Sequence, residues 1–220
     1  MPATARILLL LVLFSGCHLR PATVPLRTIE VEPGVPGSRL LVVLLPGRRD
    51  SPEDFARFGW GELARKSGAG ARIVAVDAHL GYYHRRTILD RLREDVIAPA
   101  QARGINRIWL AGVSLGGTGS ILYSIEHPED VRGIALFAPF LGEEEHRDPP
   151  DFQRRMWSWL EAGPATPIYL GWGTEDDFAP MNGLLGKTLP AERVFTIPGG
   201  HDWKTWTKLW ELFLETGALK

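Results

Sequence analysis

Hydrophobic residues in this chain gather in short runs, and each run has the length of a β-strand. The run over 39–45 is apolar at every position after Arg39, which is typical of a strand covered on both faces of a sheet. A weaker run over 26–32 lies among prolines and is expected to form at most an edge strand. The sequence predicts the remaining strands over 72–77, 107–113, 131–137, 167–172 and 192–197.

Helix signals separate these strands. Ser51 precedes Pro52 and has a carboxylate three residues later, which together predict a helix start, and Gly68 predicts its end. Pro99 should bend a second, longer helix or mark a late break in it. The alternation of strands and helices favours an α/β fold with a doubly wound, mostly parallel sheet of about six to seven strands. Helices are predicted over 52–66, 87–103, 115–127, 152–160 and 204–214.

Composition restricts the possible functions only modestly. The chain has 220 residues, which suits one well-packed domain, expected over 38–220. Hydrophobic residues make up 45%, charged residues 23%, and the net charge is −1. This balance gives no reason to expect binding to nucleic acid, and nothing in the sequence identifies a protein partner.

The first residues differ from the rest and are read as a targeting segment. Arg6 precedes an apolar run over 7–14, which is too short to span a bilayer but suits a signal peptide over 1–17. Cys17, the single cysteine, follows Ser15 and Gly16, so the segment resembles the lipobox of bacterial lipoproteins. We therefore expect export to the periplasm or cell envelope and a lipid anchor on Cys17, the alternative being an ordinary cleaved signal peptide. Residues 18–37 would form a tether that includes the possible edge strand.

One motif dominates the chemistry. Ser114 lies in the pattern G-x-S-x-G between Gly112 and Gly116, directly after a predicted strand and before a predicted helix. A strand-to-helix turn this tight leaves no room for side chains two residues on either side of the serine. It also exposes the serine hydroxyl beside a helix N-terminus, where negative charge is favoured. The pattern predicts a nucleophile, the alternative being a glycine-rich structural turn.

A nucleophilic serine needs a base, a carboxylate that orients the base, and donors for the oxyanion. His201 stands in a glycine-rich loop after the last predicted strand, where a catalytic base is expected. Three candidate carboxylates follow the penultimate strand, at 175–177. The oxyanion donors are predicted to be two main-chain N–H groups, that of Leu115 and that of Arg48 in the loop after the strand 39–45.

These motifs together resemble a small bacterial α/β-hydrolase of the esterase/lipase superfamily over about 38–216. The segments that carry the resemblance are 45–47, 112–117, 173–178 and 199–203. The resemblance implies Asp176 as the acid, three residues after Gly173, with Asp177 as the alternative. It also implies an α/β-hydrolase fold that is reduced at its N-terminal edge and has a small lid or none.

The function implied by the resemblance is hydrolysis of small carboxylic esters through an acyl-enzyme, with no cofactor and no metal. A lysophospholipase or thioesterase is the alternative among enzymes. The alternative that is not an enzyme is a binding protein with the same fold and no catalytic activity. The expected partners are a small-molecule ester and a membrane reached through the lipid anchor.

Overall fold

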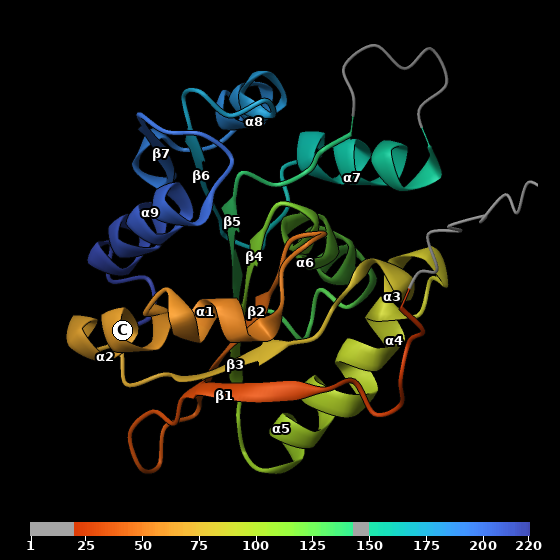
Figure 1. The fold of residues 1–220 in the computed structure, drawn as a ribbon, viewed down its shortest axis with the longest axis vertical. Coiled ribbons are helices and arrows are strands. Elements are labelled where there is room, and N and C mark those ends of the chain that lie inside the picture. The colour runs from red at the N-terminus through yellow and green to blue at the C-terminus, as the bar shows by residue number, and fades with distance from the viewer. Residues whose placement is uncertain (1–19, 143–149) are drawn as a thin grey trace, which may run out of the picture.

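A seven-stranded sheet runs through the protein, shown in Figure 1 as a computed structural model that describes residues 20–142 and 150–220. The strand order is β1-β3-β2-β4-β5-β6-β7. Six strands are parallel, and β1 pairs antiparallel with β3 at the edge. The strands are β1 (Thr28–Glu32), β2 (Leu40–Leu45), β3 (Arg72–Val76), β4 (Arg107–Val113), β5 (Gly133–Phe137), β6 (Ile168–Gly173) and β7 (Val194–Ile197).

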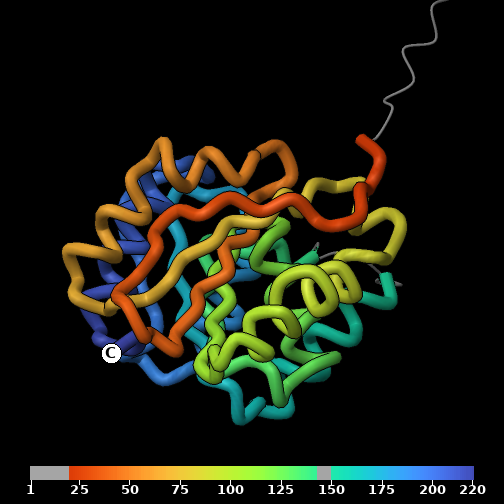
Figure 2. Tube along the Cα trace, turned by 90° about the horizontal axis from the view of Figure 1, so that it is seen from below, coloured from red at the N-terminus to blue at the C-terminus, as the bar shows by residue number. Residues whose placement is uncertain are grey.

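Helices cover both faces of this sheet (Figure 2). The helices are α1 (Pro52–Arg57), α2 (Trp60–Ser67), α3 (Leu80–His84), α4 (Ile88–Leu92), α5 (Ala98–Ala102), α6 (Leu115–Glu126), α7 (Asp151–Glu161), α8 (Ala179–Gly186) and α9 (Trp203–Glu215). A π-helical segment, η1 (Arg93–Ile97), joins α4 to α5, and a 3-10 turn, η2 (Ala191–Arg193), precedes β7. Helices α1, α2 and α9 lie on one face, while α4, α5 and α6 lie on the other. The predicted doubly wound α/β fold is confirmed.

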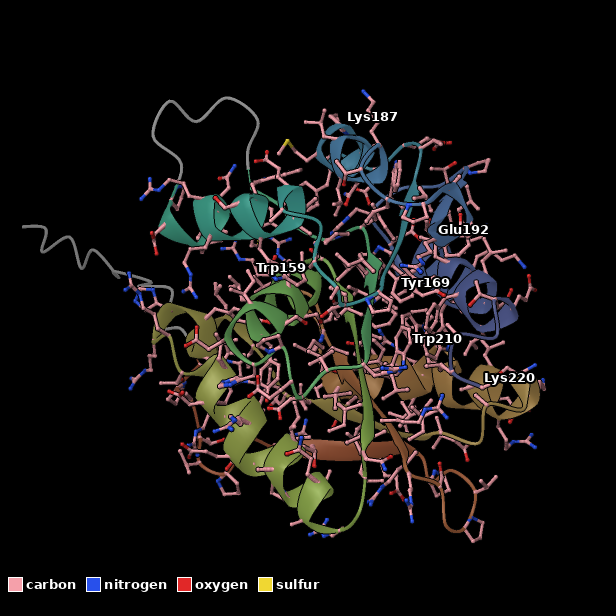
Figure 3. The ribbon with its side chains drawn as sticks, turned by 180° about the vertical axis from the view of Figure 1, so that it is seen from behind. Trp159, Tyr169, Lys187, Glu192, Trp210 and Lys220 are labelled. Carbon is pink, nitrogen blue, oxygen red and sulfur yellow. The ribbon has the colours of Figure 1, made fainter. Side chains whose placement is uncertain are left out.

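The core lies between the sheet and these two layers. All six residues of β2 are buried, as its continuous apolar run predicts for a strand covered on both faces. On the α9 face, Trp60 and Trp210 stack with ring centroids 4.8 Å apart, and Phe137 meets Trp60 edge-on. Trp210 on α9 and Tyr169 on β6, both labelled in Figure 3, each contact the Phe213 ring, at 5.4 Å and 5.2 Å. These indoles therefore pack the core, where large aromatic rings contribute most to burial.

Two helices differ from the sequence prediction in ways that have a local cause. The helix expected over 52–66 is broken after α1, because Gly59 adopts φ = 75° and starts α2 anew. The long helix expected over 87–103 is interrupted by η1, directly before Pro99 in α5. Since proline has no N–H and its ring would clash with the carbonyl four residues earlier, a π-helical turn is a way to accommodate it.

The N-terminal edge is more ordered than a tether. The predicted edge strand is present as β1, and Leu26 just before it is buried, with its N–H donating to Asp95 at 2.7 Å. Arg20 forms an ion pair with Asp77 at the end of β3. Residues 20–27, expected to be part of a tether, thus contact the domain, which begins before residue 38.

The targeting segment falls outside this description. The signal peptide over 1–17 and Cys17 lie outside the described residues, as does the segment 143–149. In the part of the chain that the structure describes, no helix has the length and apolar character needed to cross a membrane.

Candidate active site

Ser114 occupies a strained turn between β4 and α6. Its φ of 51° and ψ of −117° lie outside the regions that non-glycine residues ordinarily adopt. A Cβ on Gly116 would collide with the Leu45 carbonyl oxygen, and one on Gly112 would collide with the Gly116 main chain. These contacts explain both glycines of the motif. The turn has the geometry expected of a nucleophile elbow, with Ser114 at the carboxyl end of the central strand.

His201 and Asp176 come from neighbouring loops at the same edge of the sheet. Asp176 follows β6 and His201 follows β7, which is parallel to β6. The two loops are tied together by main-chain hydrogen bonds, since the Glu175 N–H donates to the Gly199 carbonyl at 2.9 Å. Because parallel strands end at one edge, these residues meet Ser114 there.

The three side chains form one hydrogen-bonded series. His201 Nε2 lies 2.9 Å from Ser114 Oγ, and His201 Nδ1 lies 2.7 Å from Asp176 Oδ2. A carboxylate can only accept a hydrogen bond, so Nδ1 carries the proton and Nε2 offers its lone pair to the serine hydroxyl. This tautomer is the one in which an imidazole can act as a base toward the serine.

Burial distinguishes Asp176 from its neighbour. The Asp176 side chain is fully buried, and its second oxygen accepts from the Phe178 N–H at 2.8 Å. Both oxygens therefore have partners, which meets the requirement for a buried carboxylate. Asp177 is exposed and is not part of the series. The structure thus places the alternative acid outside the site.

The predicted oxyanion donors belong to Leu115, which follows Ser114, and to Arg48, which follows Gly47. Leu115 is the first residue of α6, a position whose N–H has no partner inside its own helix. Arg48 lies in the loop after β2, where the Asp50 N–H donates to the Gly47 carbonyl at 3.2 Å. A Cβ on Gly47 would be 3.4 Å from Ser114 Cβ, so this loop passes directly beside Ser114.

Aromatic rings surround the imidazole. Phe178 and Trp206 both meet His201 edge-on, with ring centroids 4.8 Å and 4.9 Å away. Phe140 continues this apolar wall, 5.4 Å from Phe178. Trp172, near the end of β6, is not part of this wall but is buried against Gly186 of α8. The apolar part of the site is therefore built mainly by phenylalanines.

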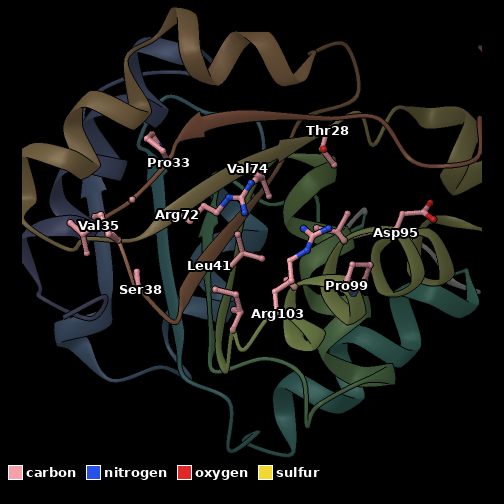
Figure 4. Close-up of a pocket in the computed structure, with 16 residues that line it drawn as sticks. Thr28, Pro33, Val35, Ser38, Leu41, Arg72, Val74, Asp95, Pro99 and Arg103 are labelled. Carbon is pink, nitrogen blue, oxygen red and sulfur yellow. The ribbon is translucent and has the colours of Figure 1, made fainter.

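A cavity of about 610 Å³ lies away from these residues (Figure 4). Leu41 and Arg72, near the beginnings of β2 and β3, line it together with Pro99 of α5. It contains none of the three hydrogen-bonded side chains and lies where the strands begin, whereas Ser114 follows the end of a strand. The candidate active site thus rests on the geometry around Ser114.

A small cluster of possible metal-binding groups lies beyond the C-terminal end of α6. Ligand atoms of His127, Glu129 and Asp130 lie within 4.8 Å of one another. The Asp130 carboxylate already accepts from the Tyr123 hydroxyl and from Gln101, both at 2.8 Å. The cluster is at the opposite end of α6 from Ser114 and is not connected to the candidate site.

The fold and the elbow agree with a match to a known family. A sequence model described as the alpha/beta hydrolase family matches residues 42–217. The chain belongs to the α/β-hydrolase family. No curated protein sequence matches this α/β-hydrolase significantly.

Solved structures share the fold of this α/β-hydrolase at low sequence identity. A ferulic acid esterase is 15% identical with a TM-score of 0.62, over 82% of this chain and 86% of its own. A predicted CIB-like hydrolase from Thermoplasma acidophilum is 18% identical with a TM-score of 0.61, over 88% of this chain and 96% of its own. A monoacylglycerol lipase from Paleococcus ferrophilus is 15% identical with a TM-score of 0.58, over 87% of this chain and 98% of its own. At these identities the likeness establishes the fold.

One residue of the site was not singled out by the sequence. Asp50 ends the loop after β2, and its Oδ1 accepts from Trp203 Nε1 at 2.9 Å. Burial raises the pKa of this carboxyl, while the hydrogen bond from Trp203 opposes the rise. The only signal was its position in the loop that carries Arg48, since its pairing with Trp203 joins residues 153 positions apart.

Proposed function

We propose that this α/β-hydrolase is a serine hydrolase that cleaves carboxylic esters through an acyl-enzyme. The observation that carries the proposal is the hydrogen-bonded series from Ser114 Oγ through His201 to Asp176. A serine in this setting can be deprotonated as it attacks, and the buried carboxylate stabilises the imidazolium that results.

In the first half of the reaction, Ser114 Oγ attacks the ester carbonyl carbon while its proton passes to His201 Nε2. The electron pair of the carbonyl moves to its oxygen, and the N–H groups of Leu115 and Arg48 stabilise the oxyanion. The bond to the alcohol oxygen then breaks, and His201 gives its proton to that oxygen.

In the second half, His201 takes a proton from water and the hydroxide attacks the acylated serine. The second tetrahedral intermediate collapses, Ser114 recovers its proton from His201, and the carboxylic acid leaves. Asp176 keeps the imidazole in one orientation throughout.

The fold neighbours and the surroundings of the site support this assignment. Two of the structures with this fold are named as an esterase and a lipase. Phe178 and Phe140 offer an apolar surface beside His201, which suits the hydrocarbon part of an ester.

The proposal is tested by covalent labelling and turnover together. The wild-type protein should be labelled by a fluorophosphonate probe and should hydrolyse p-nitrophenyl butyrate. The variant Ser114→Ala should bind no probe and lose at least about 10³-fold in kcat, because the covalent route is gone. A lysophosphatidylcholine and an acyl thioester assayed in parallel separate the two alternative substrate classes. An unlabelled wild type, or a variant that keeps a tenth of the activity, would overturn the proposal.

A further inference from the structure

A carboxylate that the proposed reaction does not use lies beside the nucleophile. A Cβ on Gly47 would collide with the Asp50 carboxylate and would stand 3.4 Å from Ser114 Cβ. The Asp50 carboxylate and the Ser114 side chain are therefore neighbours on either side of Gly47. A side chain at position 47 would displace the Asp50 carboxylate from this place.

The position of this carboxylate is well defined. Asp50 Oδ1 accepts from Trp203 Nε1 at 2.9 Å. The Trp203 ring is itself fixed, because it stacks on Phe58 with 5.0 Å between ring centroids and meets Phe55 edge-on at 5.0 Å. Within the described ranges, no arginine or lysine forms an ion pair with Asp50. The carboxylate thus adds an unneutralised negative charge to the site.

Aromatic contacts connect the Asp50 carboxylate, through Trp203 and Trp206, to His201. Trp203 contacts Trp206 at 5.3 Å, and Trp206 contacts His201 at 4.9 Å. Burial raises the pKa of Asp50, and the charge of His201, when this residue is protonated, opposes the rise, as expected for neighbouring groups. In the proposed reaction His201 returns its proton to the alcohol oxygen, so the alcohol lies beside His201 and Ser114, close to Asp50.

We propose that Asp50 determines specificity for the alcohol part of the ester, accepting a hydrogen bond from a free hydroxyl of a polyol such as glycerol and disfavouring anionic alcohols. The inference rests on the proposed ester hydrolysis. A carboxylate offers only acceptors, so a hydroxyl on the leaving group is the donor it matches. A negative charge on the leaving group would meet like charge in a partly water-excluded site, where repulsion is stronger than in bulk water.

The test compares three butyrate esters that differ only in the alcohol: glycerol, propanol and 3-hydroxypropanoate. Asp50→Asn removes the charge and keeps an acceptor, whereas Asp50→Ala removes both. The glycerol-to-propanol ratio of kcat/KM should fall by about 3-fold in the first variant and about 10-fold in the second, as expected for a charge-assisted hydrogen bond. The ratio of the anionic ester to propyl butyrate should rise by about 5-fold or more in both.

Controls separate specificity from damage to the fold. Asp177→Asn removes an exposed negative charge outside the hydrogen-bonded series and should change neither ratio by more than about 2-fold. Trp203→Phe keeps the stacking but removes the donor to Asp50, and should lower the glycerol ratio less than Asp50→Ala does. A purely structural role would lower kcat/KM for all three esters together and leave both ratios unchanged.

The outcomes also distinguish this inference from the function on which it rests. Ratios that stay the same in Asp50→Asn and Asp50→Ala, with the esters still hydrolysed, overturn the role of Asp50 alone. A wild type that hydrolyses none of the esters overturns the proposed function and this inference together.

Discussion

Asp176 Oδ2 lies 2.7 Å from His201 Nδ1, although the two residues are 25 positions apart in the sequence. The contact exists because each residue follows one of two adjacent parallel strands, β6 and β7. Asp177, one residue further, is exposed. Of these two consecutive carboxylates, only Asp176 therefore contacts the imidazole.

Asp176→Asn and Asp177→Asn form a matched pair that tests this assignment. Asp176→Asn should lower kcat by about 10⁴-fold, because an amide no longer favours the tautomer with the proton on Nδ1 and does not stabilise the imidazolium. Asp177→Asn should stay within about 3-fold of the wild type, since an exposed charge is screened by solvent. Turnover of p-nitrophenyl butyrate measures both. Equal losses in the two variants would argue against Asp176 as the acid.

The stability of the protein should depend on the protonation of His79. This residue is buried, and its Nδ1 accepts from the Gly81 N–H at 3.1 Å, capping α3. Burial, followed by the charge of Arg20, lowers its pKa from the ordinary value of about 6.5. The unfolded chain therefore binds a proton here more readily than the folded one. The contribution of His79 is present above about pH 6.5 and is lost as the pH falls through its lower folded pKa.

The variant His79→Asn keeps a side-chain acceptor without titrating in this range. Its Tm should fall less than that of the wild type when the pH is lowered from about 7.5 to about 5.5. The control is His84→Asn, which replaces an exposed histidine. Its Tm should change with pH as the Tm of the wild type does. Identical pH dependence in His79→Asn and the wild type would show that another group is responsible.

The sequence predicted the strands and the loops that carry the site because their signals are local. The apolar run of β2 indicates by itself a strand that is buried on both faces. The glycines around Ser114 likewise indicate a turn with no room for side chains. The features that the sequence did not predict depend on contacts between distant residues or on weak sequence patterns. Helix α8 contains two glycines and a proline and has no clear apolar periodicity, so nothing in its sequence predicts a helix. The pairing of Asp50 with Trp203 requires knowing how two loops pack.

Gly116→Ala should destabilise the protein, because the new Cβ would collide with the main-chain carbonyl of Leu45 rather than with a movable side chain. The expected loss is about 2–4 kcal/mol in the free energy of unfolding, measured in urea, typical of severe steric conflicts in a core. Gly183→Ala is the control: it lies in α8 with no atom within 4 Å of the added Cβ. It should be neutral or stabilise by up to about 1 kcal/mol through helix propensity. A Gly116→Ala variant as stable as Gly183→Ala would contradict the tight turn.

We further propose that Cys17 carries the lipid anchor of an exported protein. The support is the sequence alone: Arg6, the apolar run over 7–14, and a single cysteine after Ser15 and Gly16. In a bacterial host the wild type should fractionate with membranes, and mass spectrometry should find acyl chains on an N-terminal Cys17. Cys17→Ser should leave an uncleaved or soluble form. An unmodified mature N-terminus elsewhere would contradict the proposal.

The length of the preferred acyl chain should be short to medium. Among the described residues between β5 and β6, α7 is the single helix, and it packs against α6, so little apolar surface is available to close over Ser114. Phe140 contacts Phe178 and Phe152, which together offer a wall of limited extent beside the nucleophile. A chain that outgrows this wall remains in water and gains no further binding energy.

For p-nitrophenyl esters from C2 to C16, kcat/KM should therefore rise by about 4-fold per methylene, the equivalent of about 0.8 kcal/mol each, and level off by about C6. Phe140→Ala should flatten this rise, because the variant loses part of the wall while Ser114, His201 and Asp176 stay in place. Preference for acetyl esters alone would mean that the aromatic rings pack away from the substrate. A steady rise to C16, or activation at an oil–water interface, would mean that a longer apolar channel or a closing lid covers the site.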